Sequence, residues 1–241
     1  MIIYEEYIKN KSVALIGPAA YMVGTNYGVE IDQHDVVVRL NRGVELVEKY
    51  PDDIGIRTDV LYSCLIEKPG NAGPYQPLDL KNNHDIKVVV APPHSDFQGI
   101  AHATRLHELV NRIKAKELSD ILTLRIVDHK FHTAMAKSIE CKPNTGFMAI
   151  YDILRYKPSK LSLYGFSFYL DGFMPGCKKG VEDEQKFADN CFVSKRHVQK
   201  NMWKAAKNSL LKLDNVVTDK VLTEILNMQE FSVSSYQNLK K

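Results

Sequence analysis

The stretch Ser12–Asn41, SVALIGPAAYMVGTNYGVEIDQHDVVVRLN, decides the fold that this sequence predicts. It opens with the apolar run Val13–Ile16, which indicates a buried strand, and Gly17-Pro18 ends that run in a sharp turn. A second apolar run, Val36–Leu40, indicates the next strand and delivers Asn41 to its end. Because open α/β sheets bind ligands at the carboxyl ends of their strands, we expect a ligand beside this turn.

The turn itself has the composition of an anion-binding site. Gly17, Ala19 and Ala20 carry little side-chain bulk, so the backbone can approach a ligand, and the N–H groups opening the next helix would face an anion. The dinucleotide fingerprint G-x-G-x-x-G is absent because Pro18 and Ala19 follow Gly17, which disfavours a dehydrogenase. From spacing alone, a nucleotide or phosphate ligand stays open beside the alternative of a plain, nucleotide-sized βαβ opening such as many oxidoreductases use.

Strands and helices alternate along the rest of the chain. We expect strands at 59–63, 86–91, 122–127, 160–165 and 216–217, and helices at 98–116, 145–156, 195–213 and 221–228. This alternation predicts an α/β fold with a mostly parallel sheet and helices on both faces, forming a single domain over residues 1–241.

The remaining segments predict connections. We expect residues 43–56 to be an exposed connection, 68–83 a loop, 168–190 a mobile lid, and the tail from about residue 229 to fray.

Composition is that of an ordinary globular protein. The 241 residues are 44% hydrophobic and 25% charged, and the net charge of +3 is too slight to favour nucleic acid as a partner. The first twelve residues, MIIYEEYIKNKS, contain neither a signal-peptide core nor a span of about twenty apolar residues. We therefore expect a soluble, cytoplasmic protein without a transmembrane segment.

Cysteine and histidine spacing provides no metal signature. The four cysteines form no C-x-x-C pair, so free buried thiols are the expected state. Asp128, His129 and His132 have no further ligand beside them and are expected to be structural or exposed; the same expectation holds for His94, His102 and His107.

A second anion site is predicted at the helix that follows Asn144. Asn144-Thr145-Gly146 forms a helix N-terminus, where an asparagine commonly caps the first turn. The strand at 160–165 brings Gly165-Phe166 to a sheet end, close to such a helix. A simple helix cap is the alternative that any protein could show.

Three blocks together resemble the motifs of the eukaryotic-type sialyltransferases, glycosyltransferase family 29. The first is the stretch from Ser12 to Arg42, the second is Pro143–Phe147 followed by Leu163–Phe166, and the third is His197. The resemblance extends from about Ser12 to about Lys207 and is specific because the blocks occur in the family's order.

The resemblance implies a sialyltransferase-like nucleotide-binding sandwich and an inverting, metal-independent glycosyltransferase. Such an enzyme transfers sialic acid from CMP-sialic acid, its co-substrate, to a hydroxyl of a glycan or glycolipid acceptor and needs no other cofactor. The sequence agrees in lacking a D-x-D pair on the end of a predicted strand.

The resemblance also implies roles for individual residues. His197 would be the general base, and its imidazole has a suitable unperturbed pKa. A solvated histidine on a basic helix is the alternative. Asn41 would bond the nucleotide phosphate or ribose, and Asn144, Thr145 and Gly146 would grip the CMP.

The chain departs from the family at several positions. The family asparagine after the turn glycine is Pro18 here, so a contact there would involve backbone groups of 18–20. A second family histidine is missing, and Lys178 or Lys179 could supply its positive charge. Met202 stands where the family has an acid, which leaves the orientation of His197 unexplained. The family's disulfide is absent because Val13 replaces one cysteine, in agreement with a reducing compartment.

These departures keep two alternatives open. The donor could be CMP-Kdo, which has the same carboxylate-bearing anomeric centre. The chain could also be a nucleotide-binding module without transfer activity.

Overall fold

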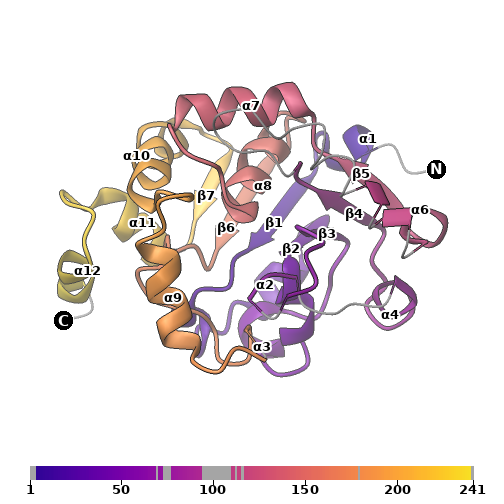
Figure 1. Ribbon diagram of the computed structural model, residues 1–241, viewed down its shortest axis with the longest axis horizontal. Coiled ribbons are helices and arrows are strands. Elements are labelled where there is room, and N and C mark those ends of the chain that lie inside the picture. The colour runs from indigo at the N-terminus through magenta and orange to yellow at the C-terminus, as the bar shows by residue number, and fades with distance from the viewer. Residues whose placement is uncertain are drawn as a thin grey trace.

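One seven-stranded parallel sheet forms the centre of the protein (Figure 1). A computed structural model describes residues 4–68, 70–72, 77–93, 110–111, 113–114, 117–178 and 180–239. The strand order is β5-β4-β3-β2-β1-β6-β7, and each neighbouring pair in the described residues runs parallel. The strands are β1 (Ser12–Ile16), β2 (Val36–Leu40), β3 (Val60–Tyr62), β4 (Val88–Ala91), β5 (Thr123–Ile126), β6 (Lys160–Tyr164) and β7 (Val216–Thr218).

The central strands are buried on both faces, which explains why their sequences are continuous apolar runs. β2 is buried at every residue, and β1 and β6 are buried at all but their first. Ala14 of β1 lies opposite Val37 of β2 on one side and Ser162 of β6 on the other. Runs of this kind are typical of parallel sheets covered by helices. The predicted fold class and strands are confirmed.

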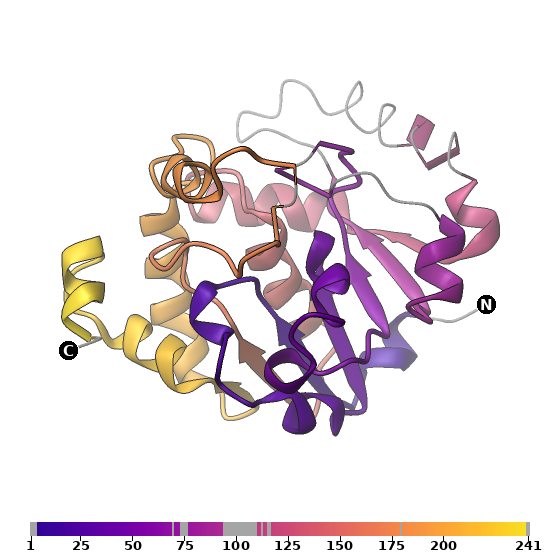
Figure 2. The ribbon, with the colours of Figure 1, turned by 90° about the horizontal axis from the view of Figure 1, so that it is seen from below.

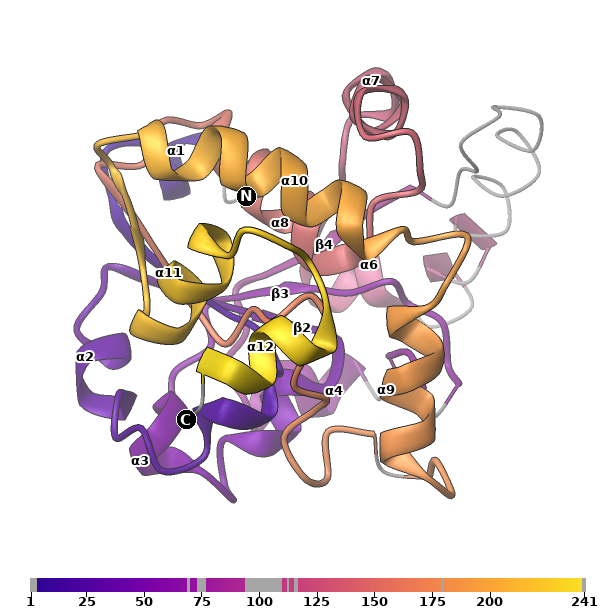
Figure 3. The same cartoon turned by 90° about the vertical axis from the view of Figure 1, so that its left-hand side faces the viewer.

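Helices cover both faces of the sheet, as Figure 3 shows with α8 and α10 on one side and α2, α3 and α4 on the other. Side chains of α1, α8, α10 and α11 form one core with alternate residues of the strands, and those of α2 and α3 form a second. A third cluster packs Leu80 of α4 with Leu61 of β3 and Val89 of β4. The helices are α1 (Tyr4–Ile8), α2 (Gly28–Asp32), α3 (Pro51–Ile54), α4 (Pro77–Asn82), α6 (Leu118–Ile121), α7 (His129–Ser138), α8 (Thr145–Leu154), α9 (Glu184–Phe192), α10 (Gln199–Ser209), α11 (Lys220–Asn227) and α12 (Val233–Leu239), with 3₁₀ turns η1 (Ala20–Met22), η2 (Asn41–Leu46) and η3 (Leu210–Lys212).

Two segments expected to be loops are packed instead. Residues 43–56 form η2 and α3, and Val44, Leu46 and Ile54 are buried there, so this is not an exposed connection. The predicted loop at 68–83 ends in α4. Their apolar residues are too few to show a helical period, so the sequence alone suggested exposure. Most of the helix expected at 98–116 lies outside the described residues.

The tail from residue 229 does not fray: it forms α12, and Tyr236 is only 2% exposed. α12 and α1 lie on opposite sides of the molecule (Figure 2). In the segment 168–190, Phe173 and Met174 are buried, and the Met174 N–H donates to the Pro18 carbonyl over 2.8 Å. This segment packs against the turn after β1, and its mobility stays a prediction.

No helix in the described part of the chain combines the length and the apolar character needed to cross a bilayer.

A buried polar network ties α8 to the sheet. Asp152 of α8 has no exposed side-chain surface and accepts hydrogen bonds to both carboxylate oxygens from Arg125 of β5. The Tyr62 hydroxyl of β3 also donates to Asp152 over 2.7 Å, and Tyr4 of α1 bonds Tyr62 over 2.6 Å. These bonds hold the helix whose N-terminus reaches the carboxyl edge of the sheet.

Replacing Asp152 by alanine is expected to destabilise the fold by about 3–5 kcal/mol, because it leaves the Arg125 guanidinium partly buried without its carboxylate. Urea unfolding followed by circular dichroism measures this loss. Asp214→Ala, which removes an exposed carboxylate, should change stability by less than about 0.5 kcal/mol. A loss at Asp152 no larger than that of the control would contradict the structural importance of the network.

Candidate functional site

A cavity of about 490 Å³ opens where the order of the strands reverses. The chain builds β1 to β5 outward on one side of β1 and then returns to place β6 and β7 on the other side. Turns that leave neighbouring strands in opposite directions separate at such a point and form a crevice. The turns after β1, β2 and β6 all line the cavity.

The turns after β1 and β6 are held in backbone contact. A Cβ on Gly17 would meet the Gly165 carbonyl oxygen at 2.3 Å, and one on Gly165 would meet the Gly17 oxygen at 2.5 Å. The Gly17 N–H donates to the Tyr164 carbonyl over 2.7 Å, and the Ala19 N–H donates to the Gly165 carbonyl over 3.0 Å. Glycine is required at both positions because the two backbones touch.

This contact corrects the prediction for the first turn. Gly17 and Ala20 do not line the cavity, whereas Pro18 and Ala19 do. The N–H groups of Gly17 and Ala19 are used by the β6 turn, Pro18 has none, and only the three-residue η1 follows. The glycine serves backbone packing, and the N–H groups of Gly17 and Ala19 are not available to an anion. A ligand contact at residues 17–20 stays a prediction.

Asp219 stabilises the turn after β6 through hydrogen bonds. The sequence did not indicate this role. Its Oδ2 accepts from the Gly165 N–H and from the Tyr21 hydroxyl, both over 2.8 Å, and its Oδ1 caps α11 through Leu222. Burial raises the pKa of this carboxyl group. An aspartate before a predicted helix indicates a cap, but its contact with Gly165 is not visible in the sequence.

Asn41 lines the cavity directly after β2, as predicted. Its backbone has a φ of 46°, a left-handed conformation that asparagine tolerates better than most residues. Its side-chain oxygen accepts from the Cys64 N–H over 2.9 Å. The group that Asn41 can offer a ligand is therefore its amide NH₂.

The N-terminus of α8 lies in the cavity, and Asn144, Thr145 and Gly146 all line it. Asn144 is the N-cap, since its Oδ1 accepts from the Phe147 N–H over 2.8 Å. A Cβ on Gly146 would approach Leu40 and Phe166 to 3.0 Å, so the helix start packs closely against the strand ends. First-turn N–H groups have no partner within a helix, so this terminus is suited to an anion.

His197 lines the same cavity and is partly buried. It precedes α10, which begins at Gln199, rather than standing on that helix as expected. Its Nδ1 lies 2.8 Å from the Lys142 carbonyl oxygen, an arrangement that requires the proton on Nδ1. This carbonyl orients the ring in place of the missing acid, and Nε2 carries the lone pair.

The surroundings keep the His197 imidazole neutral. Burial, helped by the charges of Lys142 and Arg196, lowers its pKa to about 4. The unperturbed value on which the base assignment rested therefore does not hold in the folded protein. A neutral imidazole with a free lone pair on Nε2 can still accept a proton.

The charged side chains of the described cavity lining are all cationic. Lys178 is 7% exposed, and its Nζ donates to the Gly70 carbonyl over 3.0 Å and lies 4.5 Å from the centre of the Phe173 ring. Lys179 lies outside the described residues. The described lining contains no Asp or Glu, and its cations are Arg42, Lys68, Lys142, Lys178 and Arg196.

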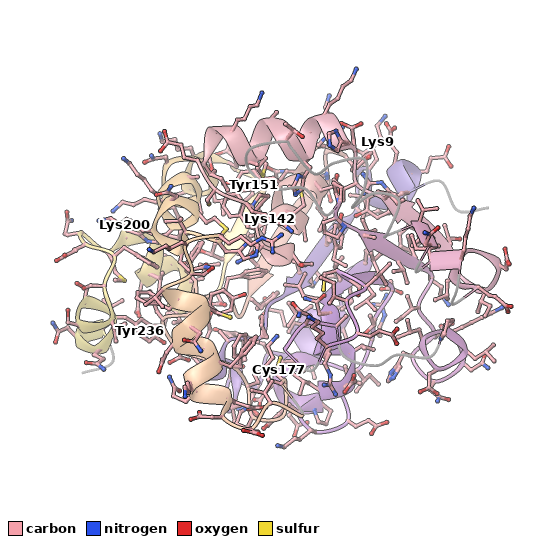
Figure 4. All side chains as sticks on the ribbon, in the orientation of Figure 1. Lys9, Lys142, Tyr151, Cys177, Lys200 and Tyr236 are labelled. Carbon is pink, nitrogen blue, oxygen red and sulfur yellow. The ribbon has the colours of Figure 1, made fainter. Side chains whose placement is uncertain are left out.

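Sulfur and histidine side chains also line the cavity. All four cysteines are free, as predicted, and burial raises the pKa of the lining thiols Cys64, Cys177 and Cys191, which stay protonated. Lys142 and Cys177 are marked in Figure 4. His132 is buried, in agreement with the structural role that was one of its two expected roles, and its place at the cavity wall is new. His94, His102 and His107 lie outside the described residues, and in the rest no cluster of His, Cys, Asp or Glu could hold a metal.

The model of glycosyltransferase family 29 (sialyltransferase) matches residues 7–171, more than half of the chain. The chain belongs to this family. The match includes the turns after β1 and β6 and the start of α8, and it ends before His197 and Lys178, whose roles stay predictions.

Solved structures show the same fold. A mammalian sialyltransferase in complex with Gal-β-1-3GalNAc-ortho-nitrophenol is similar with a TM-score of 0.58 and 16% identity, over 90% of this chain and 71% of that chain. A variant of the sialyltransferase CST-II in complex with CMP is similar with a TM-score of 0.53 and 14% identity, over 82% of this chain and 76% of that chain. No curated protein gives a significant sequence match. The protein is thus a sialyltransferase-like glycosyltransferase.

The His197 imidazole is expected to titrate with a pKa near 4, because protonation would put a charge in a partly buried site beside two cations. Two-dimensional ¹H–¹⁵N NMR of the imidazole measures the midpoint and shows whether Nδ1 carries the proton. A His197→Gln sample identifies the signal. A midpoint near 6.5 would contradict the buried, carbonyl-bonded arrangement.

Proposed function

We propose that this enzyme transfers sialic acid from CMP-sialic acid to a hydroxyl of a glycan acceptor, with inversion and without a metal ion. One observation carries the proposal: a cavity with no Asp or Glu among its described lining residues contains a helix N-terminus, five cationic side chains and an oriented neutral imidazole. This arrangement fits a donor that has both a phosphodiester and a carboxylate.

The N-terminus of α8 is the proposed seat of the CMP phosphate. The N–H groups of Thr145 and Gly146 and the positive end of the helix dipole favour a negative charge there. The Asn41 amide, which lines the cavity at the end of β2, is proposed to donate to the phosphate or the ribose. The structure of CST-II with bound CMP supports a cytidine nucleotide as ligand of this fold.

His197 is the proposed general base. Its Nε2 takes the proton of the acceptor hydroxyl while that oxygen attacks the anomeric carbon, and the Nδ1–H bond to the Lys142 carbonyl holds the ring in place. The bond from the anomeric carbon to the phosphate oxygen breaks, and CMP leaves with the electron pair. Attack on the face opposite the leaving group inverts the configuration.

Cations on the cavity wall take the role that a metal ion would otherwise fill. The charge that develops on the departing phosphate is stabilised by the nearest lysines and arginines, with Lys178 proposed in place of the missing family histidine. The turn formed by Gly165 and Phe166 lines the same space and is proposed to contact the donor.

Replacing His197 by alanine is expected to lower kcat by about 10²- to 10⁴-fold, since a positioned base contributes that much, while CMP affinity stays within about threefold. The release of CMP from CMP-sialic acid and from CMP-Kdo, with EDTA present and with a neutral galactoside as acceptor, measures turnover and the donor. His34→Ala, which removes a buried histidine bonded to Ser162 away from the cavity, is the control for general loss of folding.

Unchanged turnover in His197→Ala would refute the base, and turnover lost on adding EDTA would refute the metal-independent reaction. A preference for CMP-Kdo would assign the other donor. The anomeric configuration of the product, determined by NMR, tests inversion.

Replacing Asn144 by aspartate is expected to weaken CMP binding at least tenfold. Aspartate retains the cap on α8, so the helix stays formed, but its charge repels the phosphate at the helix start. Isothermal titration with CMP measures the change. Asn190→Asp adds the same charge on an exposed position of α9 and should have little effect. Equal affinities in the two variants would place the phosphate elsewhere.

A further inference from the structure

A second cavity, of about 400 Å³, lies between α9 and α12; we name it the α9–α12 groove. Both helices follow residue 171, where the match to the family model ends. The groove shares one wall residue, Tyr169, with the main cavity. The two cavities therefore lie next to each other, on either side of Tyr169.

The polar lining of the groove is opposite in charge to that of the main cavity. It contains the carboxylates of Asp171 and Asp189 and the amides of Gln185 and Gln237, and no described lining residue is Lys, Arg or His. The Gln185 amide donates to Asp189 over 2.9 Å, which holds two of these groups together. Acceptor oxygens and amides of this kind bind hydroxyl groups, whereas the carboxylates repel phosphates and anionic sugars.

Aromatic rings complete the groove. Tyr169, Phe192 and Tyr236 line it. Tyr236 of α12, labelled in Figure 4, is only 2% exposed, so Tyr169 and Phe192 are the rings that a ligand can reach. Aromatic faces beside polar groups suit a ligand with both apolar C–H faces and hydroxyl edges. A neutral pyranose has this combination.

The turn that presents Tyr169 has an unusual sequence. The Leu170 N–H donates to the Ser167 carbonyl over 3.0 Å, and the two central residues, Phe168 and Tyr169, have φ values of 51° and 61°. A turn with positive φ at both central positions is normally formed by Asn-Gly, and bulky residues adopt it at an energetic cost. Phe168 faces the main cavity and Tyr169 borders both cavities. Strained residues of this kind occur where a ligand is held.

We propose that the α9–α12 groove binds neutral sugar units of the acceptor glycan that lie beyond the unit carrying the reacting hydroxyl. This inference rests on the proposed function and deepens it, because it makes the preferred acceptor a neutral oligosaccharide rather than a single sugar. Tyr169 stacks against the chain where it passes from the cationic cavity to the acidic groove.

Titration calorimetry at saturating CMP with a neutral β-galactoside disaccharide and tetrasaccharide tests the groove. We expect the native chain to bind the tetrasaccharide about tenfold more tightly, as one or two hydrogen bonds to charged groups would give. The double variant Asp189→Ala/Gln237→Ala should lose this gain and keep its affinity for the disaccharide. Tyr169→Leu should lose the gain and Tyr169→Phe should retain it, because only the ring is needed.

The matched control is Asp214→Ala/Gln33→Ala, which removes an exposed carboxylate and an exposed amide outside the groove and should keep the gain. Equal affinities for the two oligosaccharides in the native chain, or a gain that survives the groove variant, would overturn the proposal. CMP release from CMP-sialic acid is measured on the same samples. A chain that never consumes the donor refutes the proposed function, whereas a chain that does so without any length dependence refutes the groove alone.

Discussion

The backbone contact between Gly17 and Gly165 determines where everything else in this site can lie. It joins the ends of β1 and β6 at the point where strand order reverses, and Asp219 holds the second turn in place through its N–H. Because neither turn carries a side chain at the contact, the two strand ends approach more closely than other residues would allow. The space for a ligand therefore lies beside the joined turns, toward β2 and the start of α8. The amides that could have bound an anion at the first turn are used to make this joint.

As a consequence, different groups are available to bind an anion at the two turns. At the first turn, Pro18 has no N–H group and the N–H groups of Gly17 and Ala19 already donate to the β6 turn. An anion in the cavity can therefore be bound by the N-terminus of α8 and by the lysine and arginine side chains of the cavity wall. The main cavity, whose charged side chains in the described lining are all cationic, and the acidic α9–α12 groove share Tyr169 as a wall residue. Two adjoining sites of opposite charge are suited to a reaction that joins an anionic donor to a neutral acceptor.

Local features of this fold were predictable and distant contacts were not. Burial on both faces produces the apolar runs of β1 and β2, and the Asn144 cap depends on a bond three residues away, so both were visible in the sequence. The partners of His197 and Gly165 are far along the chain, at Lys142 and Asp219, and no spacing rule indicates them. The tail after residue 229 was expected to fray because its composition is polar, although residues 233–239 form α12 and bury the Tyr236 ring.

The buried imidazole of His197 couples the proposed chemistry to the acid tolerance of the fold. Its pKa of about 4 lies below the unfolded value of about 6.5, so the unfolded chain takes up a proton in mild acid before the folded chain does. The free energy of unfolding therefore decreases as the pH falls from about 6.5 toward 4. The full pKa difference between the unfolded and folded chain corresponds to a loss of about 3 kcal/mol. Replacing His197 by a residue that does not titrate would remove the proposed base, and it would also remove this loss of stability in acid. An inactive variant at His197 could thus survive acid better than the native enzyme.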